Sequence, residues 1–170
     1  DVVKYDGDKY VNYSLNNITF EKTGWPFRAE TLLDVDFTGT TMTLSSTEDV
    51  DFYIQNVKFT LLTATPRTVD ITNTEGLWFF YIDNTDTLVA SQVAWTLEAG
   101  NKALVAYGYW DAVNNEMAAF AYECHTYDMP TSVHRDLHNG VGTILRSGLA
   151  VSDSGSDTLN VTAGILLDED

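Results

Sequence analysis

The stretch that decides the fold is Leu77-Trp78-Phe79-Phe80-Tyr81-Ile82, followed by Asp83-Asn84-Thr85-Asp86 and then Thr87-Leu88-Val89-Ala90. Aromatic and β-branched residues of this kind favour strands, because their side chains pack well on a pleated surface. The four polar residues between the two apolar runs are typical of a turn. The stretch therefore predicts a β-hairpin.

A second hairpin with the same logic follows. The run Ala103–Trp110 leads into the polar stretch Asp111-Ala112-Val113-Asn114-Asn115, and Glu116–Tyr122 returns. Alanine and glycine recur on one face of these strands, and such small residues let another backbone approach closely. We expect that face to pack against another sheet or against a neighbouring chain.

Shorter alternating segments precede these hairpins. Alternation predicts further strands at residues 10–15, 31–37 and 41–44. Residues 50–63 also alternate, with a break at Gln55-Asn56 that fits either a bulge or a turn between two strands. The N-terminal half of the chain is therefore expected to be β-rich as well.

One short helix is predicted after the second hairpin. Thr131 or Ser132 can cap its start, and Asn139-Gly140 supplies a left-handed end, which gives a helix over about 131–139. Strands resume at residues 143–151 and 158–167, separated by a turn at 152–157. The predicted fold is a single mainly-β domain over residues 1–170, a β-sandwich or jelly-roll-like domain with one short helix. The start, Asp1-Val2-Val3, suggests a fragment of a longer protein.

The charge balance restricts the partners. The 25 acidic residues outnumber the 9 basic ones, and the net charge is −16. A surface with this much negative charge repels phosphate backbones, so nucleic acid is not expected as a partner. The same charge favours solubility or cation binding. The single cysteine, Cys124, excludes an intrachain disulfide. No run approaches the roughly 20 apolar residues of a membrane span.

The histidines of the chain invite a metal-site hypothesis. His134 and His138 would share one face of a helix, and Glu123 and His125 one face of a strand. Together these four residues could ligate Zn²⁺ or another transition metal. The alternative, which we favour, is a polar hydrogen-bond network that ties the helix to the sheet. No catalytic residue is assigned, because Cys124, Ser132 and Ser147 lack the surroundings of a nucleophile.

Two further binding hypotheses come from the loops and the aromatic residues. Loop carboxylates could ligate Ca²⁺, although their spacing does not match an EF-hand and solvated turns are the favoured interpretation; they are Asp83, Asp86, Asp153 and Asp157. The tryptophans could line a sugar-binding face together with the nine tyrosines, although aromatic residues in strands are more often core; they are Trp25, Trp78, Trp95 and Trp110.

The order of residues in the last third of the chain resembles a segment of structural proteins of tailed bacteriophages. The residues that carry the resemblance are Glu123, His125, Met129, His134, Leu137-His138, Gly142-Thr143, Ser147-Gly148-Leu149 and the ending Gly164-Ile165-Leu166-Leu167-Asp168-Glu169-Asp170. It extends over roughly residues 75–170. The sequence departs from the pattern at Cys124, where an arginine is usual, and at Pro130, where an acidic residue is usual.

The resemblance implies a virion structural protein, located in a tail, fibre or baseplate, that assembles and attaches to the host rather than catalyses a reaction. Its implied partners are other copies of itself in a trimer or ring, other virion proteins, and a glycan or protein of the host surface. Two alternatives stay open. One is a carbohydrate-binding or depolymerase tail-spike module, and the other is a metal-stabilised head or neck component.

Overall fold

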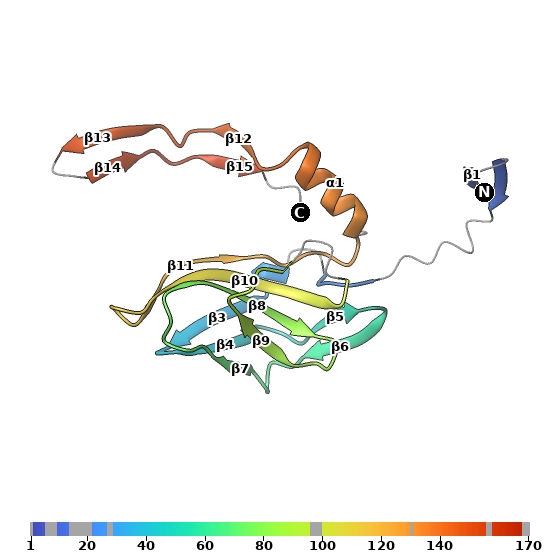
Figure 1. Ribbon diagram of the computed structural model, residues 1–170, viewed down its shortest axis with the longest axis horizontal. Coiled ribbons are helices and arrows are strands. Elements are labelled where there is room, and N and C mark those ends of the chain that lie inside the picture. Colours follow the sequence, from blue (N-terminus) through green and yellow to red (C-terminus); the bar gives the residue numbers. More distant parts are fainter. Residues whose placement is uncertain are drawn as a thin grey trace.

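The fold is mainly β, as the sequence predicts (Figure 1). The computed structural model describes residues 2–5, 10–13, 22–26, 29–95, 100–129, 131–155 and 158–167. Most of the described strands pair in antiparallel hairpins between neighbours in sequence. Such local pairing explains why alternation and turn residues located most of the strands, although those at Val2–Tyr5 and Arg67–Asp70 were not predicted.

Both predicted central hairpins are confirmed, and together they form a four-stranded sheet. Its strands are β8 (Gly76–Asp83), β9 (Leu88–Ser91), β10 (Lys102–Asp111) and β11 (Glu116–Tyr122), in the order β11-β10-β8-β9. Alternate residues of β8 face the interior, and Trp78, Phe80 and Ile82 are buried. The small residues of β10 serve close packing: a side chain on Gly108 would collide with Met117 and with the carbonyl of Ala119 on β11.

A second layer covers the inner face of this sheet. It contains a three-stranded sheet of order β3-β4-β7, formed by β3 (Leu33–Thr38), β4 (Thr41–Ser46) and β7 (Arg67–Asp70). It also contains the hairpin of β5 (Val50–Ile54) and β6 (Val57–Leu61). Gln55 and Asn56 both have positive φ, at 51° and 66°, so the predicted break is a tight turn and not a bulge.

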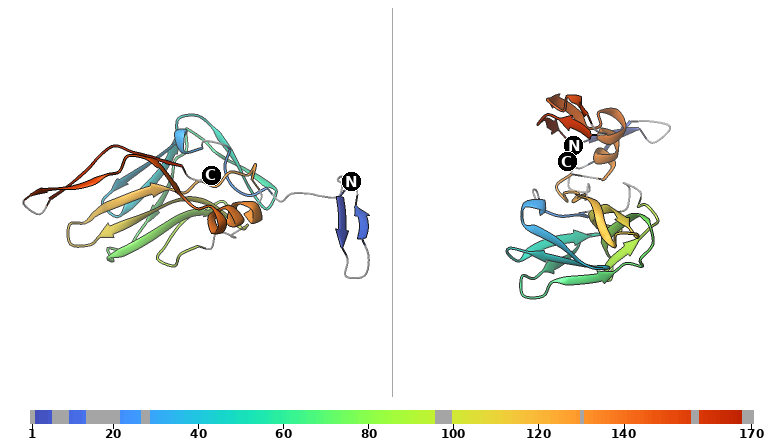
Figure 2. Two further views of the ribbon diagram at one scale, coloured as in Figure 1. Left: turned by 90° about the horizontal axis from the view of Figure 1, so that it is seen from above. Right: turned by 90° about the vertical axis from the view of Figure 1, so that its left-hand side faces the viewer.

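The hydrophobic core lies between these two layers, which gives the described region 22–129 the character of a β-sandwich (Figure 2). Phe37 of β3 meets Phe80 of β8 edge to face, with ring centroids 5.7 Å apart. Each fully buried large apolar side chain stabilises the fold by about 1.5–3 kcal/mol.

A short segment around Trp25 ties three parts of the sandwich together. The Gly24 N–H donates to the Tyr53 carbonyl at 2.8 Å, and the Trp25 N–H donates to the His125 carbonyl at 2.8 Å. The buried Trp25 indole donates to the Leu104 carbonyl at 2.5 Å. Gly24 has a φ of 124°, and a side chain there would collide with the His125 carbonyl, so only glycine fits.

The predicted helix is present as α1 (Thr131–Gly140), and a 3-10 turn, η2 (Ala29–Thr31), was not predicted. Its end at Gly140 lies within one residue of the prediction, but the left-handed conformation expected at Asn139-Gly140 is not found there. Gly142, with a φ of 61°, is the residue in the left-handed conformation, and the N–H groups of Val141 and Gly142 both donate to the Leu137 carbonyl. Of the two glycines, Gly140 and Gly142, the later one ends the helix with a left-handed conformation. No described helix is long and apolar enough to cross a membrane.

The last described elements form a long hairpin that we call the arm, residues 144–167. Its strands are β12 (Ile144–Ser147), β13 (Val151–Gly155), β14 (Thr158–Val161) and β15 (Ile165–Leu167). The two predicted strands are therefore each interrupted, at residues 148–150 and 162–164. β12 pairs with β15 and β13 with β14, and neither pair joins a sheet of the sandwich (Figures 1 and 2).

At the other end of the chain, β1 (Val2–Tyr5) and β2 (Tyr10–Tyr13) form a separate hairpin. The last two residues of the strand predicted at 10–15 lie outside the described residues. The buried hydrophobic residues of the described region all lie between Trp25 and Trp110. That 1–170 is one domain stays a prediction.

Candidate functional site

Glu123 and His125 lie side by side where the chain leaves β11, as their two-residue spacing predicts. His125 Nε2 lies 2.9 Å from Glu123 Oε1, and the two side chains are 10% and 18% exposed. The Glu123 N–H donates to the Val105 carbonyl at 2.9 Å, while the His125 carbonyl accepts from Trp25. The backbone on both sides of the pair is therefore fixed to the sandwich.

The other two predicted metal ligands, His134 and His138, belong to α1, and their side chains lie outside the described residues. Within the described part of the chain, no three histidine, cysteine, aspartate or glutamate side chains are grouped so that they could hold a metal ion. The metal site therefore stays a prediction. The hydrogen-bond alternative, a network that ties the helix to the sheet, also stays a prediction, since the contact of Glu123 with His125 lies within one segment.

Of the loop aspartates considered for Ca²⁺, Asp83 and Asp153 stabilise their own turns. Asp83 Oδ1 accepts from the Thr85 N–H, the Thr85 hydroxyl and the Thr87 N–H. Burial raises the pKa of Asp83, but the hydrogen bonds from Thr85 and Thr87 outweigh it and hold that pKa below its usual value. Asp86 pairs with Arg67 at 2.6 Å, and Asp153 accepts from the Gly155 N–H at 2.7 Å. Asp157 lies outside the described residues.

The tryptophans mostly belong to the core, which is the interpretation favoured from the sequence. Trp25 and Trp110 are fully buried, and Trp78 is 7% exposed. Trp95 is the exception, because it is only partly buried and meets the ring of Phe79 edge to face at 5.1 Å. The tryptophans therefore do not form the exposed sugar-binding face considered above.

The outer side of the four-stranded sheet forms a partly exposed aromatic surface, against which the Trp95 ring packs at 5.1 Å from Phe79 and 6.4 Å from Tyr81. We call it the aromatic face, and it is the outer side of the four-stranded sheet with Leu77, Phe79, Tyr81, Tyr107 and Tyr109. Tyr107 lies opposite Phe79, and Tyr109 lies opposite Leu77 in the strand register. Leu77, Tyr107 and Tyr109 are 49%, 39% and 40% exposed. The alternation of β8 could have predicted this face, because residues 77, 79 and 81 point outward when residues 78, 80 and 82 are buried.

Polar groups border the aromatic face. The Tyr109 hydroxyl donates to Glu75 Oε1 at 2.7 Å, and Glu75 Oε2 accepts from the Ala112 N–H at 2.7 Å. The hydrogen bond to Glu75 raises the pKa of Tyr109 above its usual value. At the other end, Lys102 Nζ lies 4.2 Å from the ring centre of Tyr81, a cation–π geometry. Flat rings beside fixed polar groups are suited to binding sugars.

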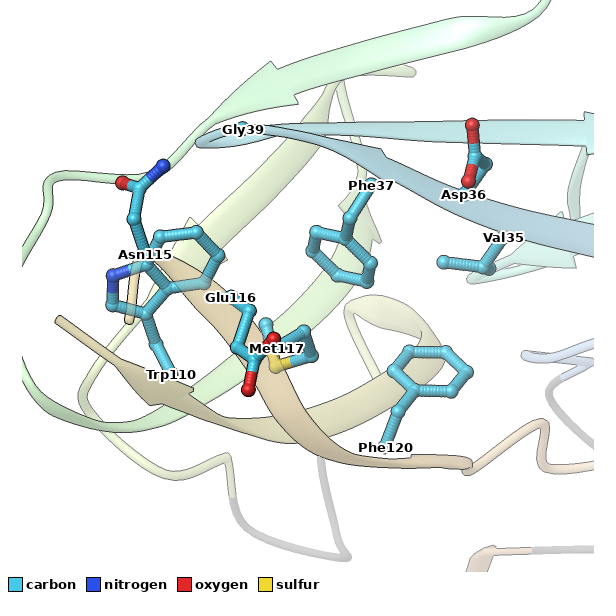
Figure 3. A pocket seen from close by; sticks show the side chains of 9 residues that line it. All are labelled: Val35, Asp36, Phe37, Gly39, Trp110, Asn115, Glu116, Met117 and Phe120. Carbon is cyan, nitrogen blue, oxygen red and sulfur yellow. The ribbon is translucent and has the colours of Figure 1, made fainter. Parts of the chain in front are cut away.

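A groove of about 380 Å³ opens between β3 and β11, one edge strand from each of the two larger sheets (Figure 3). Its apolar part includes Phe37, Met117 and Phe120, and two carboxylates, Asp36 and Glu116, also line it. Figure 3 shows these two carboxylates turned in different directions and not toward a common point. They therefore lack the arrangement of a glycosidase, in which two carboxyl groups flank one bond.

Tyr122 links the same two edge strands. Its hydroxyl accepts from the Val35 N–H at 3.3 Å and lies 3.5 Å from the Leu33 carbonyl. Burial raises the pKa of Tyr122. The groove was not predicted from the sequence, since the lining residues of β3 and β11 are about 80 positions apart.

The residues considered as nucleophiles have structural surroundings. The Cys124 thiol donates to the Val105 carbonyl at 3.5 Å within the sheet. Ser147 lies in the exposed arm, and the side chain of Ser132 lies outside the described residues.

Comparisons with family models, with curated proteins and with solved structures found no match to this chain. A function must therefore be inferred from its own residues. The structural features on which such an inference can rest are the Glu123–His125 pair, the aromatic face, the groove and the arm.

Proposed function

We propose that the chain is a virion structural protein of a tailed virus, a component of the tail, fibre or baseplate that serves assembly and host attachment and not catalysis. The observation that carries the proposal is the residue order from Glu123 to Asp170, which resembles structural proteins of tailed bacteriophages. No other feature of the chain points to a class of protein as directly.

The geometry supports this proposal because separate parts of the resembling segment have structural tasks. Glu123 and His125 lie at the junction with the sandwich, where they contact each other at 2.9 Å. Ser147-Gly148-Leu149 and Gly164 come together in the middle of the arm, where Gly148 and Gly164 pass too closely for larger residues. A motif whose residues hold a backbone crossing fits a role in architecture better than a role in chemistry.

The proposal is tested by locating the chain in infected cells and in purified particles. Mass spectrometry of purified virions should find peptides of the chain at a copy number comparable to that of other tail components. Antibodies against the chain should label one end of the particle in electron micrographs. Presence of the chain in infected cells together with its absence from purified virions would overturn the proposal.

A second candidate function is binding of a host-surface glycan, and the aromatic face favours it. Tyr107 and Tyr109 are each about 40% exposed beside the fixed Glu75 carboxylate. A carbohydrate is commonly held by stacking of a sugar on an exposed ring, while a neighbouring carboxylate accepts hydrogen bonds from the sugar hydroxyl groups. Attachment of this kind is compatible with a virion role.

A glycan array separates the second candidate from a purely structural role. Binding that is lost in Tyr107→Ala and Tyr109→Ala, and retained in Phe120→Ala on the groove, would assign it to the aromatic face. Absence of binding to any glycan, or equal binding by all three variants, would reject the assignment.

A further inference from the structure

The arm exposes an unusual amount of apolar surface for a soluble protein. The exposed fraction of its large aliphatic residues ranges from 36% to 69%. These residues are Ile144, Leu145, Leu149, Val151, Leu159, Val161, Ile165, Leu166 and Leu167. A two-stranded hairpin is at best marginally stable alone in water. An arm with this composition therefore needs a cover that the described residues of the chain do not provide.

The strand register shows which sides need the cover. In the outer half, Val151 lies opposite Val161, and the next pair, Ser152 opposite Asn160, points to the other side. The face of Val151 and Val161 also contains Leu159 and, opposite it, Asp153, whose carboxylate accepts from the Gly155 N–H near the tip. This half therefore has one face that is apolar except for that carboxylate, and one polar face. In the inner half, Ile144 lies opposite Leu167 and Leu145 opposite Leu166, so both faces are apolar. A single flat partner would leave one face of the inner half in water.

The charge distribution identifies the chemistry of the cover. The arm contains Arg146, Asp153 and Asp157, so it contributes only one of the sixteen net negative charges of the chain. The remaining residues carry the other fifteen. A basic partner would be attracted to those remaining residues and would gain little on the arm. Two copies of the chain repel one another over most of their surface, and the arms are where they can meet without opposing large like charges.

The area is also of the right size. At roughly 90 Å² for a fully exposed aliphatic side chain, the nine residues expose on the order of 400 Å² of apolar surface. Since close to 60% of a typical interface is apolar, this corresponds to about 650 Å² in total. A standard interface buries about 800 Å² on each partner. The arm alone nearly reaches that value.

We propose that the arm is the self-association element of the protein and that it packs against the arms of other copies in a closed assembly of at least three chains. The apolar face of the outer half would point toward the symmetry axis and the Ser152–Asn160 face toward solvent. A twofold pair gives each arm one neighbour, whereas a ring of three or more gives it two, as the inner half requires. The resemblance already implies copies of the chain in a trimer or ring. The new step is the assignment of that contact to the arm, and it rests on the exposed residues of the arm.

The test compares two double variants of the whole chain that add the same charge to neighbouring positions of the arm. Val151→Asp with Val161→Asp places two carboxylates on the apolar face. The matched control, Ser152→Asp with Asn160→Asp, places them on the polar face. Sedimentation equilibrium at micromolar concentrations gives the mass, and near-ultraviolet circular dichroism reports whether the sandwich, with its three buried tryptophans, is folded.

The wild-type chain should have at least three times the 18.9 kDa mass of one chain. The apolar-face variant should dissociate to monomers with its near-ultraviolet spectrum unchanged, and the polar-face control should keep the wild-type mass. Hydrogen exchange supplies a second measurement, since the arm amides should exchange faster in the apolar-face variant alone. A wild-type mass of one or two chains, an undissociated apolar-face variant, or a dissociated control would each overturn the proposal.

Discussion

Gly148 and Gly164 face each other where the two strands of the arm cross. A Cβ atom built on Gly148 would lie 2.5 Å from the Gly164 Cα, and it would collide with the Ala163 carbonyl oxygen. A Cβ atom on Gly164 would in turn lie 2.7 Å from the Leu149 nitrogen. Gly148 also has a φ of 76°, which other residues rarely adopt. Both positions therefore require glycine for lack of space.

We expect Gly148→Ala to open the middle of the arm and to cost about 1–3 kcal/mol of local stability, from strain and from displaced backbone. The amides of Ala150 and Thr162 report on it, because Ala150 N–H donates to Thr162 Oγ1 and Thr162 N–H donates to the Ala150 carbonyl. Their hydrogen exchange should accelerate. Gly140→Ala is the control, since nothing lies within 4 Å of its Cβ position. Equal exchange in both variants would contradict the prediction.

Local signals in the sequence were sufficient for most strands, but β1 and β7 were not predicted. The turn at Gln55-Asn56 and both central hairpins follow from residues that are neighbours in the sequence, where turn chemistry and alternation act directly. The interruption of the arm at residues 148–150 was not predicted. It depends on the contact of Gly148 with Gly164, and alternation within one strand contains no information about that crossing.

The same distinction applies to the candidate sites. The contact of Glu123 with His125 was predictable, because residues two apart on an extended chain share a face. The groove between β3 and β11 was not, since it depends on which edges of two sheets meet. The aromatic face is an intermediate case. The alternation of Leu77 to Ile82 shows that two sets of side chains point to opposite sides of the strand, but which set faces inward depends on where the second layer packs.

Trp25 should be among the residues that matter most for stability. Trp25→Phe removes the indole that donates to the Leu104 carbonyl and leaves a space beside Phe52, whose ring centre lies 4.6 Å away. We expect a loss of about 2–4 kcal/mol in the free energy of unfolding. Trp95→Phe, at a partly exposed position, should cost about 1 kcal/mol or less. Urea unfolding followed by far-ultraviolet circular dichroism measures both, and equal losses would contradict the prediction.

The Glu123–His125 contact should stabilise the junction without a metal. His125→Ala leaves a largely buried carboxylate without its imidazole partner and should cost about 1–3 kcal/mol. Glu123→Gln keeps an acceptor oxygen for the ring and should cost less. The loss of stability in either variant should be the same with and without a chelator. EDTA should also leave the melting temperature of the wild-type protein unchanged. A melting temperature that falls with EDTA and recovers with Zn²⁺ would instead support the site with His134 and His138.

Acid sensitivity should arise in part from Asp83. The hydrogen bonds from Thr85 and Thr87 outweigh burial and lower the pKa of Asp83, so the folded protein binds this proton less tightly than the unfolded chain does. The resulting stability is fully present above the unfolded pKa of about 3.9 and is lost as the pH falls through the lower folded value. Asp83→Asn cannot ionise, so it should be less stable than the wild type by about 1 kcal/mol at neutral pH.

The two proteins should converge as the pH falls below about 4, because the wild-type carboxyl then becomes protonated and loses its advantage over the amide. Urea unfolding at a series of pH values measures that convergence. Glu48→Gln, which removes one negative charge from the exposed turn before β5, is the matched control and should differ from the wild type by no more than about 0.5 kcal/mol at any pH. If Asp83→Asn kept a constant difference from the wild type down to pH 2, the hydrogen bonds of Asp83 would not favour the ionised carboxylate.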